Sequence, residues 1–295
     1  MTIVVSIIGE PTQRNPPAAS PVTACHRDDP RSLLRLLRAS LVHEDTDPAE
    51  FTVYSVGDDG ALLYPTPAQP LSAFRRLLGA RPLPPSGASV LRVFILRIPA
   101  ERHAVRLRCG GGVSIFFKID LPLSGVVGLC SSMELDSLGA EAVELSESLS
   151  RAPCGVAVEA RAGSGIRVRL YWMASGEAAD LVALHACRRL GLRPSQGDEL
   201  ARVWRRLTPY PDRVVLNISG DPGSAPALKL ELPAVEVARA AELVGADGAA
   251  SRAFQSALAL QTAPHRERHF PYVGVRWSGG QVPDLTFNVD ARGTV

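Results

Sequence analysis

Basic, acidic and phenolic side chains stand at alternate positions in several short apolar runs of this sequence. Arg167, Arg169 and Tyr171 alternate with apolar residues, and Lys229 and Glu231 alternate with leucines. A spacing of two places such side chains together on one face of a β-strand. We interpret a face of this composition as the wall of a binding site.

Two further runs carry the same pattern. Phe116 and Lys118 share one strand face, and Thr286 and Asn288 share another. Lys118 and Lys229 are the only lysines among the 32 basic residues. Because both fall on polar strand faces, we expect both to take part in binding.

Metal-binding patterns are weak. His265 and His269 have a metal-like spacing, but they stand in an Arg-rich loop with no predicted helix to set their geometry. The carboxylates on polar strand faces include no adjacent pair suited to a hard cation: Asp120, Glu231, Asp284 and Asp290. The sequence therefore predicts no metal site.

Gly-rich turns join the alternating runs into hairpins. The hairpins pair residues 51–56 with 61–64, 155–161 with 166–172, 214–219 with 227–232, and 272–277 with 285–290. Helical spacing is found at residues 33–41, 71–78, 135–149, 181–190, 199–207, 235–244 and 250–260. Helices followed by a hairpin recur about every 50–60 residues, which indicates a repeat.

One hairpin is ambiguous. Three strand-like runs, residues 90–98, 105–109 and 113–121, stand where the repeat needs two. The sequence does not decide which two of them pair.

The predicted helices must cover the apolar face of the sheet. The polar face then either meets water, in an open α+β sheet, or lines a closed barrel that crowds several cations together. We predict an α+β fold with a ten-stranded antiparallel β-barrel surrounded by helices and built from five ααββ repeats. Residues 1–30 are expected to form an N-terminal strand and Pro-rich arm, and residues 31–295 a single barrel domain.

The composition restricts the partners and the compartment. A net charge of +2 is too small to argue for nucleic acid or a membrane surface. The five cysteines are scattered without a Cys-x-x-Cys pair, which indicates reduced thiols. No apolar run reaches the roughly 18 residues of a membrane span. We expect a cytoplasmic protein.

The central strand and the helix that follows it resemble a known family. Residues 167–172, Arg-Val-Arg-Leu-Tyr-Trp, and a helix ending in Leu190-Gly191-Leu192 are similar to the central unit of the soluble bacterial ABBA-type aromatic prenyltransferases. Residues 208–211 and 270–274, Thr-Pro-Tyr-Pro and Phe-Pro-Tyr-Val-Gly, look like the openings of that family's fourth and fifth hairpins. The likeness is clear from residue 155 onward and weak before it.

The resemblance implies a prenyltransferase. Such an enzyme moves a dimethylallyl or geranyl group from an allylic diphosphate onto an aromatic small molecule or a peptide side chain, and buried cations stabilise the departing diphosphate. The implied diphosphate-binding residues are Lys118, Arg167, Arg169, Tyr171, Lys229 and Arg276. The implied prenyl- and acceptor-binding residues are Phe116, Asn217, Glu231, Thr286 and Asn288. No cofactor is obligatory, a supporting Mg²⁺ ion is left open, and no catalytic residue is identified.

Two departures from the family leave other functions open. Asp284 and Asn288 stand where the family carries a lysine and a tyrosine, and aromatic residues make up only 5% of the chain. One alternative is a catalytically inactive barrel that binds a small ligand. Another is an open α+β protein that acts through its polar sheet face.

Overall fold

The computed structural model describes the chain from residue 51 onward, with gaps. The described residues are 51–56, 60–64, 100–108, 113–119, 121–161, 165–175, single positions between 184 and 198, 214–244, 249–260, 269–276 and 284–290. The predicted arm at residues 1–30 and the predicted helices at 33–41, 71–78 and 199–207 lie outside these residues.

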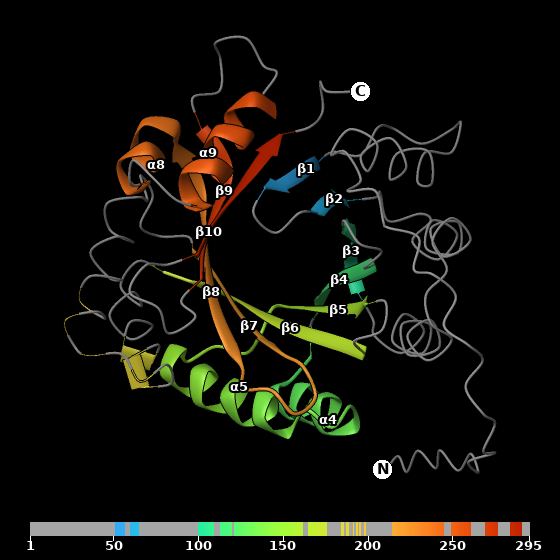
Figure 1. The fold of residues 1–295 in the computed structure, drawn as a ribbon. Helices are drawn as coiled ribbons and strands as arrows, with labels where there is room; N and C mark the ends of the chain where they lie inside the picture. The colour runs from blue at the N-terminus through green and yellow to red at the C-terminus, as the bar shows by residue number, and fades with distance from the viewer. Residues whose placement is uncertain are drawn as a thin grey trace, which may run out of the picture.

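The described strands pair in chain order. They are β1 (Phe51–Val56), β2 (Gly60–Tyr64), β3 (Ala100–Arg108), β4 (Val113–Ile119), β5 (Gly155–Arg161), β6 (Gly165–Ala174), β7 (Val214–Gly220), β8 (Ala227–Glu236), β9 (His269–Arg276) and β10 (Asp284–Asp290). Each is antiparallel to the next, and β1 pairs with β10 as well as with β2. The order of the strands is therefore that of a closed barrel (Figure 1). The predicted antiparallel sheet is confirmed.

In the described part of the chain, two helix pairs pack against the sheet from outside. These are α4 (Leu123–Ser132) with α5 (Asp136–Leu149), and α8 (Val237–Leu243) with α9 (Ala249–Leu260). Figure 1 shows the first pair at one end of the molecule and the second pair at the other, beside β9 and β10. No helix in the described segments is both long enough and apolar enough to span a bilayer.

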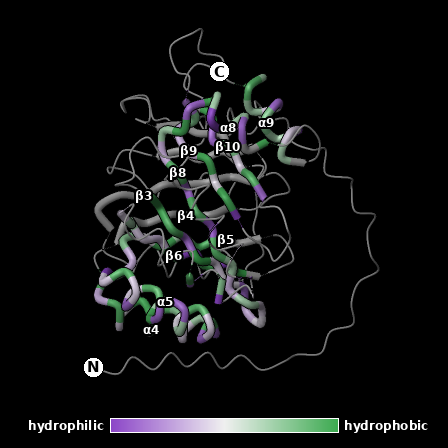
Figure 2. The backbone as a smooth tube through the Cα atoms, turned by 90° about the vertical axis from the view of Figure 1, so that its left-hand side faces the viewer, coloured by the Kyte–Doolittle hydropathy of each residue, from purple (hydrophilic) through white to green (hydrophobic). Residues whose placement is uncertain are grey.

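Apolar residues of β6, β9 and β10 lie under these helices. Trp172 of β6 is fully buried and donates a hydrogen bond from Nε1 to Ser146 Oγ of α5, at 3.1 Å. Phe254 of α9 packs on Phe270 and Phe287, with ring centroids 5.9 and 5.5 Å away. Figure 2 shows apolar positions along the strands and in the helices beside them. Because these helices lie on the outer face of the closed sheet, the alternate residues of the strands beneath them face its interior.

The ambiguous hairpin is resolved by the backbone. β3 pairs with β4, so the runs predicted at 105–109 and 113–121 form the hairpin, and β3 begins earlier, at Ala100. The third run, residues 90–98, lies outside the described residues.

Two helix predictions need correction. The start predicted at residue 235 is wrong, because β8 continues to Glu236 through pairing with β9. Helix α4 was not predicted, since its sequence, Leu-Ser-Gly-Val-Val-Gly-Leu-Cys-Ser-Ser, carries two glycines and two β-branched residues.

Candidate functional site

The strand register gathers polar residues of β6 to β9 on the inner face. Asn217 of β7 lies opposite Tyr171 of β6 on one side and Lys229 of β8 on the other. Lys229 in turn lies opposite Arg276 of β9. Residues directly opposite each other in a ladder point to the same side of the sheet.

These polar side chains are buried. Only 4% of Arg169, 5% of Lys229 and 3% of Asn217 is exposed to solvent. Charged groups leave water at a large cost unless they are paired or bind something. A water-facing sheet would expose such residues, so this face belongs to the interior of the barrel.

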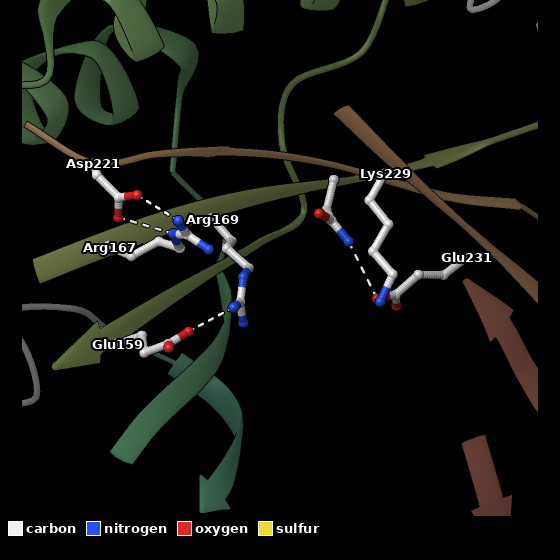
Figure 3. A network of polar contacts seen from close by, with 7 residues as sticks. Glu159, Arg167, Arg169, Asp221, Lys229 and Glu231 are labelled. Carbon is white, nitrogen blue, oxygen red and sulfur yellow. Dashed lines mark hydrogen bonds and ion pairs between the residues drawn. The ribbon is translucent and has the colours of Figure 1, made fainter. Parts of the chain in front are cut away.

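Two arginines of β6 form the first polar cluster, which we call the arginine cluster (Figure 3). Arg169 Nη2 donates to Glu159 Oε2 at 2.5 Å, and Glu159 is 1% exposed. Arg167 donates from Nε to Asp221 Oδ1 at 2.8 Å and from Nη2 to the other oxygen of that carboxylate. Both arginines therefore make charge-assisted contacts to carboxylates of the chain itself.

This pairing corrects one expectation from the sequence. Alternation along β6 predicts cations crowded together and repelling each other. The structure instead gives Arg169 a buried carboxylate from β5, and Arg167 a bidentate partner just after β7.

A second group, the lysine cluster, lies around Lys229 and is separate from the arginine cluster in Figure 3. Lys229 Nζ is 3.4 Å from Glu231 Oε1, and Asn217 Nδ2 donates to the same oxygen at 3.2 Å. β8 and β6 are two strands apart, about 10 Å at the usual strand spacing. The two clusters are thus distinct parts of the inner wall.

The Lys229 side chain passes over a glycine. A Cβ atom added to Gly274 would lie 2.3 Å from Lys229 Cε and 2.2 Å from Thr286 Oγ1. Both distances are too short for any side chain, so the lysine stem and the threonine hydroxyl fill the space above Gly274.

Thr286 offers an unused polar group at this position. Its Oγ1 is buried and has no hydrogen-bond partner among the residues that the structure describes. Because buried hydroxyls in proteins are normally hydrogen-bonded, an oxygen beside a lysine is suited to a polar atom of a ligand. A ligand oxygen could accept from both Thr286 and Lys229.

Tyr272 of β9 adds a phenol near this cluster. Burial raises the pKa of Tyr272, and the negative charge of Glu231 raises it further. The phenol therefore stays protonated near neutral pH and can donate a hydrogen bond.

The remaining predicted residues occupy the same face. Tyr171 is half-buried, Arg276 lies opposite Asp284 in the β9–β10 register, and half-buried Asn288 lies opposite Tyr272. Four of the predicted residues lie together. Lys229 and Asn217 both contact Glu231, and Thr286 and Lys229 both lie over Gly274. Arg167 and Arg169 belong to the other cluster.

Lys118 and Phe116 can be placed by their backbone alone. On β4 they lie opposite Gly155 and Ala157, which are opposite Tyr171 and Arg169 in turn. Their side chains lie outside the described part of the structure, so their roles stay predictions.

Three residues of the site were not predicted: Glu159, Asp221 and Gly274. Alternation with Val158 could have placed Glu159 on the polar face of β5. Asp221 lies in a turn, where alternation carries no signal. The need for a glycine at 274 arises only when β8, β9 and β10 lie side by side.

Carboxylates and a histidine gather at one place on the outer helices. Ligand atoms of Glu141, Glu144 and His185 lie within 4.8 Å of one another. His185 Nε2 is 2.9 Å from Glu141 Oε2, and burial lowers the pKa of His185. This cluster joins α5 to the segment around residue 185. His269, by contrast, lies 3.9 Å from Glu236, and His265 is outside the described residues.

Comparison with known proteins places the fold. No protein-family model matches the sequence, and no curated protein does. Among solved structures, the 5-dimethylallyltryptophan synthase of Streptomyces coelicolor matches with a TM-score of 0.61 and 16% identity, over 88% of this chain and 90% of that one.

Two further structures match to the same degree. The 6-dimethylallyltryptophan synthase of Micromonospora olivasterospora, "in complex with DMASPP and Trp", gives a TM-score of 0.60 and 18% identity over 85% of this chain and 83% of its own. A structure named as 6-dimethylallyl tryptophan synthase gives a TM-score of 0.64 and 17% identity over 88% of this chain and 90% of its own. The protein therefore shares the barrel fold of the ABBA-type prenyltransferases.

Proposed function

We propose that this protein is a prenyltransferase. It would move a prenyl group, dimethylallyl or geranyl, from an allylic diphosphate onto an aromatic small molecule or a peptide side chain. The observation that carries the proposal is Lys229, a buried ammonium on the inner face of a closed barrel. It lies beside the Thr286 hydroxyl, which has no hydrogen-bond partner within the described segments. The fold shared with dimethylallyltryptophan synthases supports it.

The chemistry requires the C–O bond of the donor to break. Its electron pair leaves with the diphosphate, and the allylic cation is attacked by the acceptor, which then loses a proton. Negative charge grows on the diphosphate as it departs. Cations and hydrogen-bond donors of the protein, held in a site without water, therefore stabilise the transition state. We assign this role to Lys229, Arg276 and Thr286. Lys118, Arg167, Arg169 and Tyr171 remain further candidates.

The acceptor and the prenyl chain would occupy the rest of the inner wall. Asn217 and Asn288 offer amides, Glu231 offers a carboxylate beside Lys229, and Phe116 is the proposed aromatic shield for the cation. We also propose a single domain over residues 31–295, built from five ααββ repeats and acting in the cytoplasm without nucleic acid or membrane. The proposal requires no metal: two of the described inner carboxylates, Glu159 and Glu231, contact Arg169 and Lys229.

The test is direct incubation with dimethylallyl and geranyl diphosphates and a panel of indoles, phenols and peptides, with and without EDTA. Products heavier by one prenyl unit are expected in both conditions, and Lys229→Ala should abolish them. Thermal stabilisation by the diphosphates without any product would instead identify an inactive binding barrel. If millimolar donor gives no product and no thermal stabilisation, the proposal is refuted.

A further inference from the structure

Lys229 already has an anion beside it. Its Nζ lies 3.4 Å from Glu231 Oε1, and the same oxygen accepts from Asn217. An anionic ligand that approaches Lys229 must therefore compete with a carboxylate that belongs to the protein. The arrangement bears on how tightly the proposed donor can bind.

The two clusters differ in whether such a carboxylate can move. Glu159 is 1% exposed and holds Arg169 at 2.5 Å, so it has no solvated position to adopt. The Glu231 side chain is 21% exposed, and its contact with Lys229 is longer. A partly exposed carboxylate such as Glu231 can rotate away from its cation at a much smaller cost in free energy than a fully buried one such as Glu159.

We propose that Glu231 is a built-in competitor for the anion site at Lys229. It holds the ammonium in the structure described here, and it gives way when the diphosphate of the donor binds beside Thr286. The inference rests on the proposed function and deepens it, because it makes Glu231 a determinant of donor affinity and not only a contact for the acceptor. Arg169, whose carboxylate stays in place, is then a weaker candidate for the diphosphate than Lys229.

Inorganic pyrophosphate is the probe, because it reports on the anion site without a prenyl chain or an acceptor. Its Kd is measured by isothermal titration calorimetry for the wild type and for Glu231→Gln, which removes the charge and keeps the shape. Binding should tighten about tenfold, the size of one charge-assisted contact. Glu236→Gln is the matched control, since Glu236 carries the same charge on the same strand but is half-exposed and contacts Arg239. It should leave the Kd within about twofold.

A second pair of variants tests whether the effect acts through Lys229. Lys229→Met should weaken pyrophosphate binding, and adding Glu231→Gln to it should restore nothing, because no ammonium remains to be released. Circular dichroism checks that each variant folds, and Glu231→Met replaces Glu231→Gln if the latter does not.

The outcomes separate this inference from the function. If the wild type binds pyrophosphate and Glu231→Gln binds it equally or less tightly, the competitor role is wrong while the proposed function stands. A gain that persists without Lys229 also overturns the role. If no variant binds millimolar pyrophosphate, both the competitor role and the proposed function fail.

Discussion

At the scale of single residues, the position of Lys229 depends on the absence of a side chain at 274. Gly274→Ala would place a Cβ 2.3 Å from Lys229 Cε and 2.8 Å from Nζ. It would also lie 2.2 Å from Thr286 Oγ1, so the end of the lysine and the threonine hydroxyl can no longer share this space. We expect pyrophosphate binding to weaken about tenfold or more, the loss of one charge-assisted contact, as measured by calorimetry.

A glycine outside the site provides the control for this substitution. A Cβ at Gly128 of α4 would meet nothing within 4 Å. Gly128→Ala should leave pyrophosphate binding unchanged and raise stability by up to about 1 kcal/mol, because alanine favours a helix over glycine. If the wild type and Gly274→Ala bind pyrophosphate equally, the position of Lys229 above Gly274 is not needed for binding.

Arg169 is expected to matter for stability. Arg169→Ala would remove the guanidinium that pairs with the buried Glu159 carboxylate, and breaking a buried ion pair typically costs about 3–5 kcal/mol. Arg167→Ala on the same strand breaks a pair whose side chains are 20% and 26% exposed, and should cost about 1 kcal/mol or less. Urea unfolding measures the free energy of unfolding of both variants. Equal losses would contradict the distinction between the buried Arg169–Glu159 pair and the partly exposed Arg167–Asp221 pair.

The limits of sequence reasoning are visible at this scale. Alternation placed Arg169, Asn217 and Lys229 on one face, because a period of two depends only on strand geometry. It could not supply their partners. Glu159 and Arg169 are ten residues apart, and Asp221 and Arg167 are 54 apart, so their contacts exist only after β5, β6 and β7 have paired.

At the scale of elements, the contact between β6 and α5 anchors the wall that carries the arginines. Trp172 is fully buried and donates to Ser146. Trp172→Ala should lower the free energy of unfolding by about 3–5 kcal/mol, the usual cost of deleting a buried aromatic side chain. Ser146→Ala should cost about 1 kcal/mol, since it removes only the hydrogen-bond acceptor. Chemical denaturation distinguishes the two losses, and a neutral Trp172→Ala would place this side chain outside the core.

Strands were predictable from the sequence and helices less so. Most strands join a clear alternation to a Gly-containing turn, two signals that agree. α4 has neither a strong helix composition nor side-chain caps. Its position depends on α5, where Gly139 lets the helices approach so closely that a Cβ there would lie 3.4 Å from Cys130 Cβ. Such support from a neighbour cannot be read from local spacing.

At the scale of the whole molecule, the barrel depends on one contact between distant parts of the chain. β1 pairs with β10 from Val53 opposite Asp290 to Val56 opposite Phe287. This contact leaves no sheet edge free among the described strands and turns the polar face into an interior. An open sheet would keep every hairpin and lack only this contact, so the choice between a barrel and an open sheet depends on it.

A cross-link tests this closure without reference to any ligand. Tyr54 and Val289 are direct partners across β1 and β10, where Cα atoms lie about 4.5–5.5 Å apart, within the range that a disulfide spans. Tyr54→Cys with Val289→Cys should therefore form a disulfide on mild oxidation, detected by mass spectrometry of the joined peptides. Thr52→Cys with Val289→Cys is the control, because two residues of displacement carry the Cα atoms beyond the roughly 7 Å limit. In an open sheet neither pair would form a bond, whereas equal cross-linking of both would indicate a mobile contact without a fixed register.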